Sequence, residues 1–298
     1  MKLLRNKLNL NHYWMIMPAI LVILFFFFGG ISAALLQSFG WFPGAGLSRM
    51  NLDAYVTIMQ SEDMSAGISL SLRVSLISTL LSAVIGTLLA LGCFALRGSY
   101  RRSLNVLRGG FMLPLGIPHL AAAYIILLLL SPSGWLSRCA NAVGLTNEIS
   151  DFPIVTNDAF GWGMIIAYTL KETPFIFLCI YPVLERIRGE WLDAARMFGA
   201  NGLAFARNIL LPLVMPALGA ASLIIFAYSF SAFEIPYLLG VTYPEALPIY
   251  AYELYTDDPT MRPQAMAVGI LMTVIPVGFG ALFFILLRRH LLPMWKGW

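Results

Sequence analysis

Two adjacent charged residues, Lys171 and Glu172, interrupt a long apolar stretch in the sequence IAYTLKETPFIF. Charges at membrane depth are costly, and they are expected mainly at functional sites. Neighbouring residues of a helix point about 100° apart, so these two side chains cannot simply neutralise each other along one face. Two interpretations stay open: the pair lines a path for a polar solute, or each residue forms a structural pair with another helix.

Two further ionisable residues lie within or beside apolar stretches. Glu234 follows such a stretch in FSAFEIPYLLG, where its carboxylate would attract a cationic solute or would simply be solvated at a helix end. His119 lies in LPLGIPHLAAAY, after Pro114 and Pro118. It is expected to be a neutral imidazole bonded to a neighbouring helix, with a gate or pathway contact as the alternative. These four ionisable residues are the candidates for a solute path.

The sequence contains few of the residue patterns that catalysis or metal binding requires. The three cysteines and three histidines are scattered, and no His, Cys and carboxylate cluster has the spacing of a metal site. No nucleophile and base form a recognisable constellation, and there is no GxxxxGK[ST] phosphate-binding loop. A membrane enzyme is therefore the weakest function class, and no cofactor is expected on this chain.

The elements that must position these residues are membrane helices. Hydrophobic residues make up 59% of the chain and charged residues 11%, with a mean hydropathy of +0.79. Soluble domains carry about a quarter charged residues. Since backbone groups find no water in the hydrocarbon, apolar stretches of about 20 residues must cross as helices. The sequence predicts an all-α integral membrane protein with six such helices, roughly over residues 14–36, 74–96, 109–131, 160–184, 208–233 and 265–287.

The first of these stretches is longer than the roughly 7–15 residues of a signal-peptide core, so we expect it to be a retained span. Most of the 19 basic residues lie in segments that share one side of the membrane, namely 1–13, 97–108, 185–207 and 288–298. By the positive-inside rule these segments and both termini are expected in the cytoplasm, in a bacterial inner membrane. This distribution accounts for the net charge of +4, so the charge does not indicate binding to nucleic acid.

Three longer loops are left on the outer side by this orientation. They could form a surface that meets an extracytoplasmic partner, or they could be plain connectors. The three cover about 37–73, 132–159 and 234–264.

An amphipathic stretch, EWLDAARMFGANGLAFARNILLP, begins at Glu190 in the third cytoplasmic segment and ends at Pro212, at the start of the fifth predicted span. At helical spacing one face holds apolar and small residues, and the opposite face is mainly polar. The first face holds Trp191, Ala194, Ala195 and Phe198, and the second holds Glu190, Asp193, Arg196 and Met197. Gly199 and Gly202 then predict a helix, a tight turn and a second short helix. We expect this loop to dock another protein; a helix lying on the membrane surface is the alternative.

The same stretch resembles the EAA loop of the permease subunits of binding-protein-dependent ABC importers. In that family Glu-Ala-Ala is followed after three residues by Gly, after nine more by Ile, and after one more by Leu-Pro. The sequence matches this spacing at Asp193, Ala194, Ala195, Gly199, Ile209, Leu211 and Pro212, with Asp193 in place of the usual Glu. The resemblance implies a type I importer permease fold with a cytoplasmic coupling helix that sits in a cleft of an ATPase. The coupling set then also includes Glu190, Arg196 and Ala200.

The resemblance covers about residues 70–287 and implies two parts. Residues 1–69 would hold the first helix and an outer loop, and residues 70–298 a five-helix core with the coupling loop at about 185–212. The implied partners are a cytoplasmic ABC ATPase dimer that binds ATP and Mg, an extracytoplasmic solute-binding protein and a second permease. A heterodimer of permeases is favoured over a homodimer.

The segment from Phe233 to Gly240 resembles the polyamine, thiamine, iron(III) and sulfate branch of these permeases. A polyamine-like cation is therefore the first candidate solute, with the carboxylates of Glu172 and Glu234 as its contacts, and thiamine, phosphonates, iron(III) and sulfate stay open. The alternative function is a secondary transporter or channel driven by an ion gradient. Such proteins often carry inverted repeats, and no convincing repeat is present here.

Overall fold

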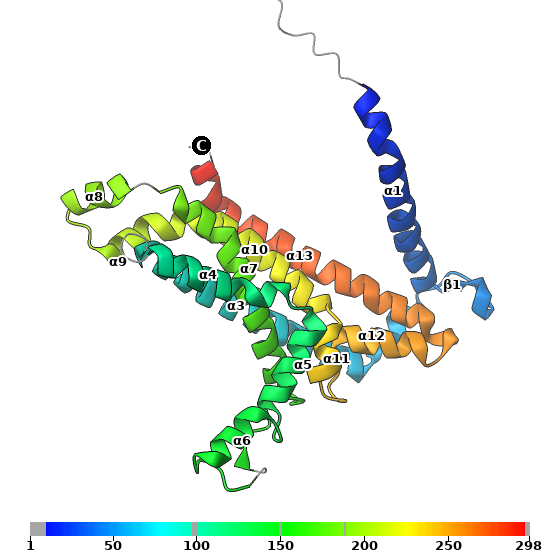
Figure 1. The fold of residues 1–298 in the computed structure, drawn as a ribbon. Helices are drawn as coiled ribbons and strands as arrows, with labels where there is room; N and C mark the ends of the chain where they lie inside the picture. The colour runs from blue at the N-terminus through cyan, green and yellow to red at the C-terminus, as the bar shows by residue number, and fades with distance from the viewer. Residues whose placement is uncertain (1–9, 97–100, 149–150, 188, 296–298) are drawn as a thin grey trace, which may run out of the picture. The chain divides into compact units, whose positions relative to one another are not determined.

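A computed structural model of the chain describes residues 10–96, 101–148, 151–187 and 189–295 (Figure 1). The predicted cytoplasmic ends over 1–9 and 296–298 lie outside the described residues. The long helices are α1 (Leu10–Ser38), α3 (Glu62–Leu96), α4 (Arg101–Gly116), α5 (His119–Leu130), α7 (Trp162–Glu185), α10 (Leu211–Ser231) and α13 (Arg262–Trp295). The short helices are α2 (Asp53–Gln60), α6 (Trp135–Ala142), α8 (Gly189–Met197), α9 (Gly202–Phe205), α11 (Glu234–Leu239) and α12 (Leu247–Thr256).

The remaining regular structure is brief. Within the described ranges, the helices are joined by the 3-10 turns η1 (Pro43–Ala45) and η4 (Pro259–Met261) and by the π-helical turn η3 (Ala206–Leu210). Strands β1 (Trp41–Phe42) and β2 (Leu47–Ser48) form an antiparallel pair with Trp41 opposite Ser48. The all-α prediction is confirmed.

Six helical stretches of the described chain are long and apolar enough to cross a membrane, as predicted. They are Trp14–Ser38, Glu62–Leu96, His119–Ala142, Trp162–Glu185, Gly202–Ser231 and Pro259–Ile285. The second begins well before the predicted residue 74, because the helix continues through the polar residues that precede the apolar stretch.

The predicted third span over 109–131 is wrong as a single helix. The chain forms α4, which ends at Gly116, and α5, which begins at His119. Pro118 causes the break, since its ring restricts the preceding residue and its nitrogen carries no hydrogen to donate.

The fifth span begins earlier than predicted and is continuous with the loop before it. Pro212 offers no N–H to the carbonyl four residues earlier. The chain passes this point as the π-helical turn η3, in which the Leu211 N–H donates to the Ala206 carbonyl. Helix α9 therefore runs through η3 into α10 without an intervening loop.

The described residues pack as two units. One comprises those of Met1–Gln60 with Ala251–Leu271, and the other those of Ser61–Tyr250 with Met272–Trp298. In the first unit the Tyr55 hydroxyl donates to Ser38 Oγ over 2.9 Å, and the Arg262 guanidinium lies over the rings of Phe42 and Tyr255. The division at residues 69 and 70 stays a prediction about the sequence.

Helix α7 is the central helix of the second unit, where it lies among α3, α4 and α10 (Figure 1). One buried cluster joins it to α3 and α10, through Ala90 of α3, Ile180 of α7 and Val214 of α10. A second cluster joins it to α3, α5 and α11 through Met164 and Tyr168. The residues around Lys171 and Glu172 therefore sit on the most buried of the six spans.

Gly86 lies where α3 crosses α7 at close range. A Cβ placed on it would lie 2.8 Å from Ile176 Cβ and 3.0 Å from the Thr173 carbonyl oxygen. We expect Gly86→Ala to lower the free energy of unfolding by about 1–3 kcal/mol, because neither a β-branched side chain nor backbone can move aside cheaply. Melting of the detergent-solubilised chain measures this loss.

Gly92, on the same helix, is the matched control, since a Cβ there would meet nothing within 4 Å. Gly92→Ala should leave the melting temperature unchanged or slightly raised, because alanine favours the helix. Equal effects of the two substitutions would contradict the close crossing.

Candidate functional site

The two charged residues of α7 point to different partners, as expected. Both are buried, with 4% of Lys171 and 9% of Glu172 exposed. Lys171 Nζ donates to the carbonyl oxygens of Pro114 (2.6 Å) and Leu115 (3.1 Å) at the end of α4. Glu172 Oε1 lies 3.2 Å from His119 Nε2 at the start of α5. The pair thus bridges the break between α4 and α5 from one side.

The Lys171 contact has a simple cause in the proline that breaks the third span. In a continuous helix the Pro114 carbonyl would accept from residue 118, which here is a proline without an N–H. The Ile117 N–H reaches that carbonyl at 3.3 Å, and the Lys171 ammonium supplies the stronger donor. These contacts agree with the structural interpretation of Lys171, although its partners are backbone carbonyls and not an acidic side chain, and a role in the solute path stays a prediction.

His119 bonds to a neighbouring helix, as expected for a histidine inside a span. Besides Glu172 it contacts Tyr228 of α10, with ring centroids 4.8 Å apart. The His119 side chain is 28% exposed and that of Glu172 is 11% exposed. This small polar group is therefore partly exposed, and a solute role for it stays a prediction.

Glu234 begins α11 and is exposed. The next residue, Ile235, packs in the same buried cluster as Tyr168, and Tyr228 packs against that cluster, so α11 begins beside these two tyrosines. Neither tyrosine was predicted from the sequence. A signal for Tyr168 was present, because it precedes Glu172 by four residues and so lies on the same face of α7.

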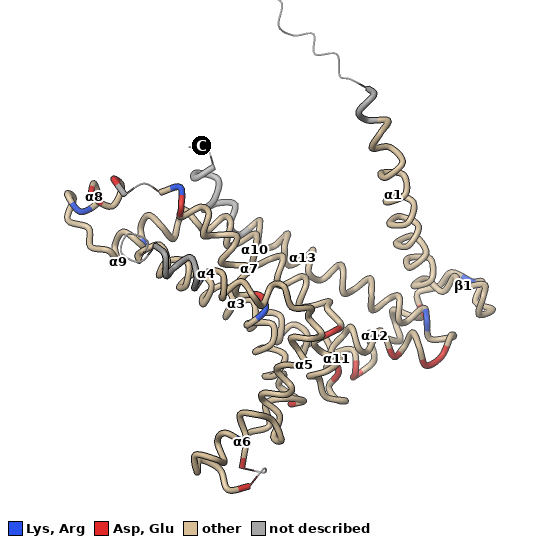
Figure 2. The backbone as a smooth tube through the Cα atoms, viewed as in Figure 1, with Lys and Arg blue, Asp and Glu red and all other residues tan. Residues whose placement is uncertain are grey.

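Figure 2 shows charged residues in the α8 region and around α11 and α12, with few along the middles of the helices. The region over 189–212 has the predicted form of a helix, a turn and a second short helix. Helix α8 ends at Met197, and Gly199 adopts a positive φ of 81°. The Gly199 N–H donates to the Arg196 carbonyl, and the Ala200 N–H donates to the Ala195 carbonyl, which is a Schellman ending. The side chain of Asn201 then accepts from the Ala204 N–H and caps α9.

The predicted coupling residues divide by exposure. Glu190, Ala194 and the Asp193–Arg196 pair, whose charged atoms are 3.6 Å apart, lie on the surface. Ala195 and Ile209 are partly buried and pack against the first core cluster, as Leu192 does. The other members sit at turns and helix starts, namely Gly199 and Ala200 in the turn, and Leu211 and Pro212 in the first turn of α10.

The residues of the predicted apolar face do not all point the same way, so the prediction of a single apolar face is wrong. Ala195 faces the core, whereas Trp191 is 47% exposed and Phe198 is 92% exposed. The cause is the early end of α8, because the chain turns at Phe198 and carries its ring outward. We define the knob surface as the exposed apolar residues Trp191, Met197, Phe198 and Leu203. Exposed apolar groups of this kind are typical of protein docking sites.

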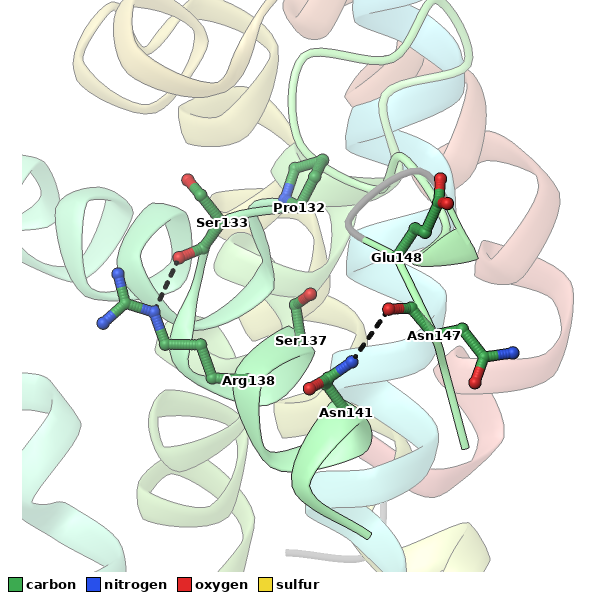
Figure 3. A pocket seen from close by; sticks show the side chains of 7 residues that line it. All are labelled: Pro132, Ser133, Ser137, Arg138, Asn141, Asn147 and Glu148. Atoms are coloured by element: carbon green, nitrogen blue, oxygen red, sulfur yellow. Dashed lines mark hydrogen bonds between the residues drawn. The ribbon is translucent and has the colours of Figure 1, made fainter. Parts of the chain in front are cut away.

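A hollow lies in the connection between α5 and α7, around α6 (Figure 3). It has a volume of about 610 Å³ and is lined by Pro132, Ser133, Ser137, Arg138, Asn141, Asn147 and Glu148. Asn141 Nδ2 donates to the carbonyls of Thr146 and Asn147 and so fixes the wall of the hollow. Nearby, the Glu148 and Asn147 N–H groups bond to Asp151 and lower the pKa of its carboxyl. Such local bonds give this loop a defined polar surface.

The sequence is similar to those of known membrane proteins of transport systems. The family model described as "Binding-protein-dependent transport system inner membrane component" matches residues 82–296. The sulfate transport system permease protein CysT of Salmonella typhimurium is 26% identical over 188 residues, which is 63% of each chain. The spermidine/putrescine transport system permease protein PotC of Haemophilus influenzae is 26% identical over 130 residues, or 43% of this chain and 49% of PotC.

The chain thus spans less than two thirds of the length of either relative. Among solved structures, a chain of a bacterial ABC transporter that imports the acidic polysaccharide alginate superposes with a TM-score of 0.78 at 22% identity. The superposition covers 93% of this chain and 94% of that one. At this identity the match shows a shared fold.

Proposed function

Since the chain belongs to the family of binding-protein-dependent transport system inner membrane components, we propose that it is the membrane-spanning subunit of an ATP-driven importer. In this role it forms part of the solute path and carries no catalytic residue. Hydrolysis of ATP, with its Mg, takes place on a separate ATPase chain, since this sequence has no phosphate-binding loop.

The observation that carries the proposal is the knob surface together with the Schellman turn behind it. The turn at Gly199 fixes the angle between α8 and α9, and α9 is continuous with the span α10. A push on the knob surface is therefore passed to a membrane helix through bonded backbone and not through a flexible loop. Leu192 and Ala195 hold the other side of α8 against the core.

The positive-inside distribution supports a cytoplasmic knob surface, within reach of an ATPase. The same orientation puts the hollow around α6 on the outer side, where it offers Arg138, Asn141 and Glu148 to a solute-binding protein. A second permease would complete the path, and a heterodimer is the arrangement that we propose.

The proposed solute is a small cation of the polyamine kind. Two carboxylates, Glu172 on α7 and Glu234 at the start of α11, lie on elements that pack together around Tyr168, which favours positive charge. The name of one relative, PotC, refers to spermidine and putrescine, whereas that of another, CysT, refers to sulfate. The names of the relatives therefore differ on the solute, and the proposal is supported by the two acidic side chains of the site.

Uptake measured with and without ATP, at a clamped ion gradient, tests the mechanism. The chain is reconstituted in proteoliposomes with its permease partner, ATPase and binding protein. We expect uptake to stop without ATP and to be indifferent to the gradient. Uptake that continues without ATP and follows the gradient would establish the alternative, a secondary transporter or channel.

The knob surface gives a second test. We expect the double substitution Met197→Ser and Phe198→Ser to reduce co-purification of the ATPase about tenfold or more, because two exposed apolar side chains leave the contact. The matched control is Val143→Ser with Leu145→Ser, which removes similarly exposed apolar groups from the connection between α6 and α7. If both pairs retain the ATPase equally, the knob surface is not its docking site.

A further inference from the structure

The polar group around Glu172 contains hydrogen-bonding atoms that have no partner within the described part of the chain. The Tyr168 residue is 0% exposed, and its hydroxyl has no hydrogen-bond partner. Glu172 bonds to His119 through Oε1 alone. Polar groups without partners are costly inside a membrane span, so they indicate a place that is completed by something other than this chain.

The charges of this group are unequal. It contains two acidic residues, Glu172 and Glu234, and one basic residue, Lys171, whose ammonium is already bonded to the carbonyls of Pro114 and Leu115. Counted formally, with histidine taken as uncharged, these side chains sum to one negative charge. A single positive charge would balance it.

The hydrogen-bonding atoms of this group also indicate which kind of cation would fit it. Carboxylate oxygens accept hydrogen bonds, and a tyrosine hydroxyl can accept as well as donate. A primary ammonium group has three N–H donors and no acceptor, so it matches Glu172 together with the hydroxyls of Tyr168 and Tyr228. A quaternary ammonium carries the same charge but has no N–H to offer these atoms.

We propose that Glu172, Tyr168, Tyr228 and Glu234 form a subsite for one primary ammonium group of the transported solute, with His119 as the side chain that covers Glu172 when the subsite is empty. This inference rests on the proposed importer function and adds to it the place and chemistry of a solute contact. His119 suits the covering role because it is the more exposed member of the pair and bonds only one carboxylate oxygen.

The test uses n-butylammonium at near-neutral pH as the probe, with tetramethylammonium and butyrate as matched probes. Binding is measured as the shift in melting temperature of the full chain in its purified complex, because a ligand of the folded state raises that temperature. We expect n-butylammonium to raise it in a saturable way and the other two probes to leave it unchanged. Equal shifts with tetramethylammonium or butyrate, or no shift with n-butylammonium, would overturn the proposal.

Two variants locate the binding. Tyr168→Phe should weaken n-butylammonium binding about tenfold while leaving the probe-free melting temperature equal or higher, because it removes a buried hydroxyl without a partner. Glu172→Gln should also weaken binding about tenfold or more. Tyr124→Phe on α5 and Glu253→Gln on α12, both at exposed residues, are the controls and should bind the probe as the natural chain does.

The pattern of results separates this inference from the importer function. If Tyr168→Phe binds the probe normally, or if it loses stability without the probe, Tyr168 has a packing role only and the subsite is wrong. ATP-dependent uptake that persists in that case leaves the importer function intact. ATP-independent uptake would overturn the importer function itself, whatever the probe does.

Discussion

Gly199→Val should separate ATP hydrolysis from transport while the membrane helices stay folded. Gly199 has a φ of 81°, a conformation that costs a β-branched residue about 1–3 kcal/mol. A Cβ there would meet nothing within 4 Å, so the whole effect acts through the backbone of the turn. Because about 1.4 kcal/mol is a factor of ten, the native turn should become about tenfold or more less favourable. We expect uptake per ATP hydrolysed to fall by a similar factor.

The measurement is uptake and ATP hydrolysis in the same proteoliposomes, with the melting temperature as the check on folding. Gly199→Asn is the matched control, since asparagine tolerates the left-handed conformation better than other non-glycine residues. It should retain most of the coupling. Normal coupling in Gly199→Val would show that the turn does not transmit the motion.

Lys171→Met should destabilise the second unit by about 2 kcal/mol or more, because it leaves the Pro114 and Leu115 carbonyls without their charged donor. For a chain of this size that loss corresponds to a fall of several degrees in melting temperature. Uptake should fall as well, since the break between α4 and α5 positions His119. A residue that only lined a solute path would leave stability unchanged or, with a buried charge removed, raise it.

A double-mutant cycle identifies the cause of that loss. Pro118→Ala restores an N–H that can donate to the Pro114 carbonyl. In that background Lys171→Met should cost less than in the natural chain, and the difference measures the coupling between the two positions. If the cost of Lys171→Met is the same in both backgrounds, the ammonium is not the substitute for the missing N–H.

The all-α membrane fold and the helix, turn and helix that carry the knob surface could both be predicted from the sequence alone. Hydropathy fixed six spans because each one needs only its own apolar residues. The spacing from Asp193 through Gly199 to Pro212 predicted a helix, a turn and a second helix, and the positive φ of Gly199 agrees. These are local properties, since a helix and its cap depend on residues that are close in sequence. The adjacent charges also predicted separate partners for Lys171 and Glu172.

The partners of Lys171 and Glu172 could be identified only from the packing of the helices. The bonds from Lys171 to Pro114 and Leu115, and from Glu172 to His119, join residues more than 50 positions apart. The hydropathy of the sequence predicted one span where the structure has α4 and α5. Hydropathy measures only polarity, so it gives no sign that Pro118 leaves the Pro114 carbonyl without an N–H donor. The unpartnered hydroxyl of Tyr168 was likewise invisible, because whether a buried polar atom is satisfied depends on every helix packed around it.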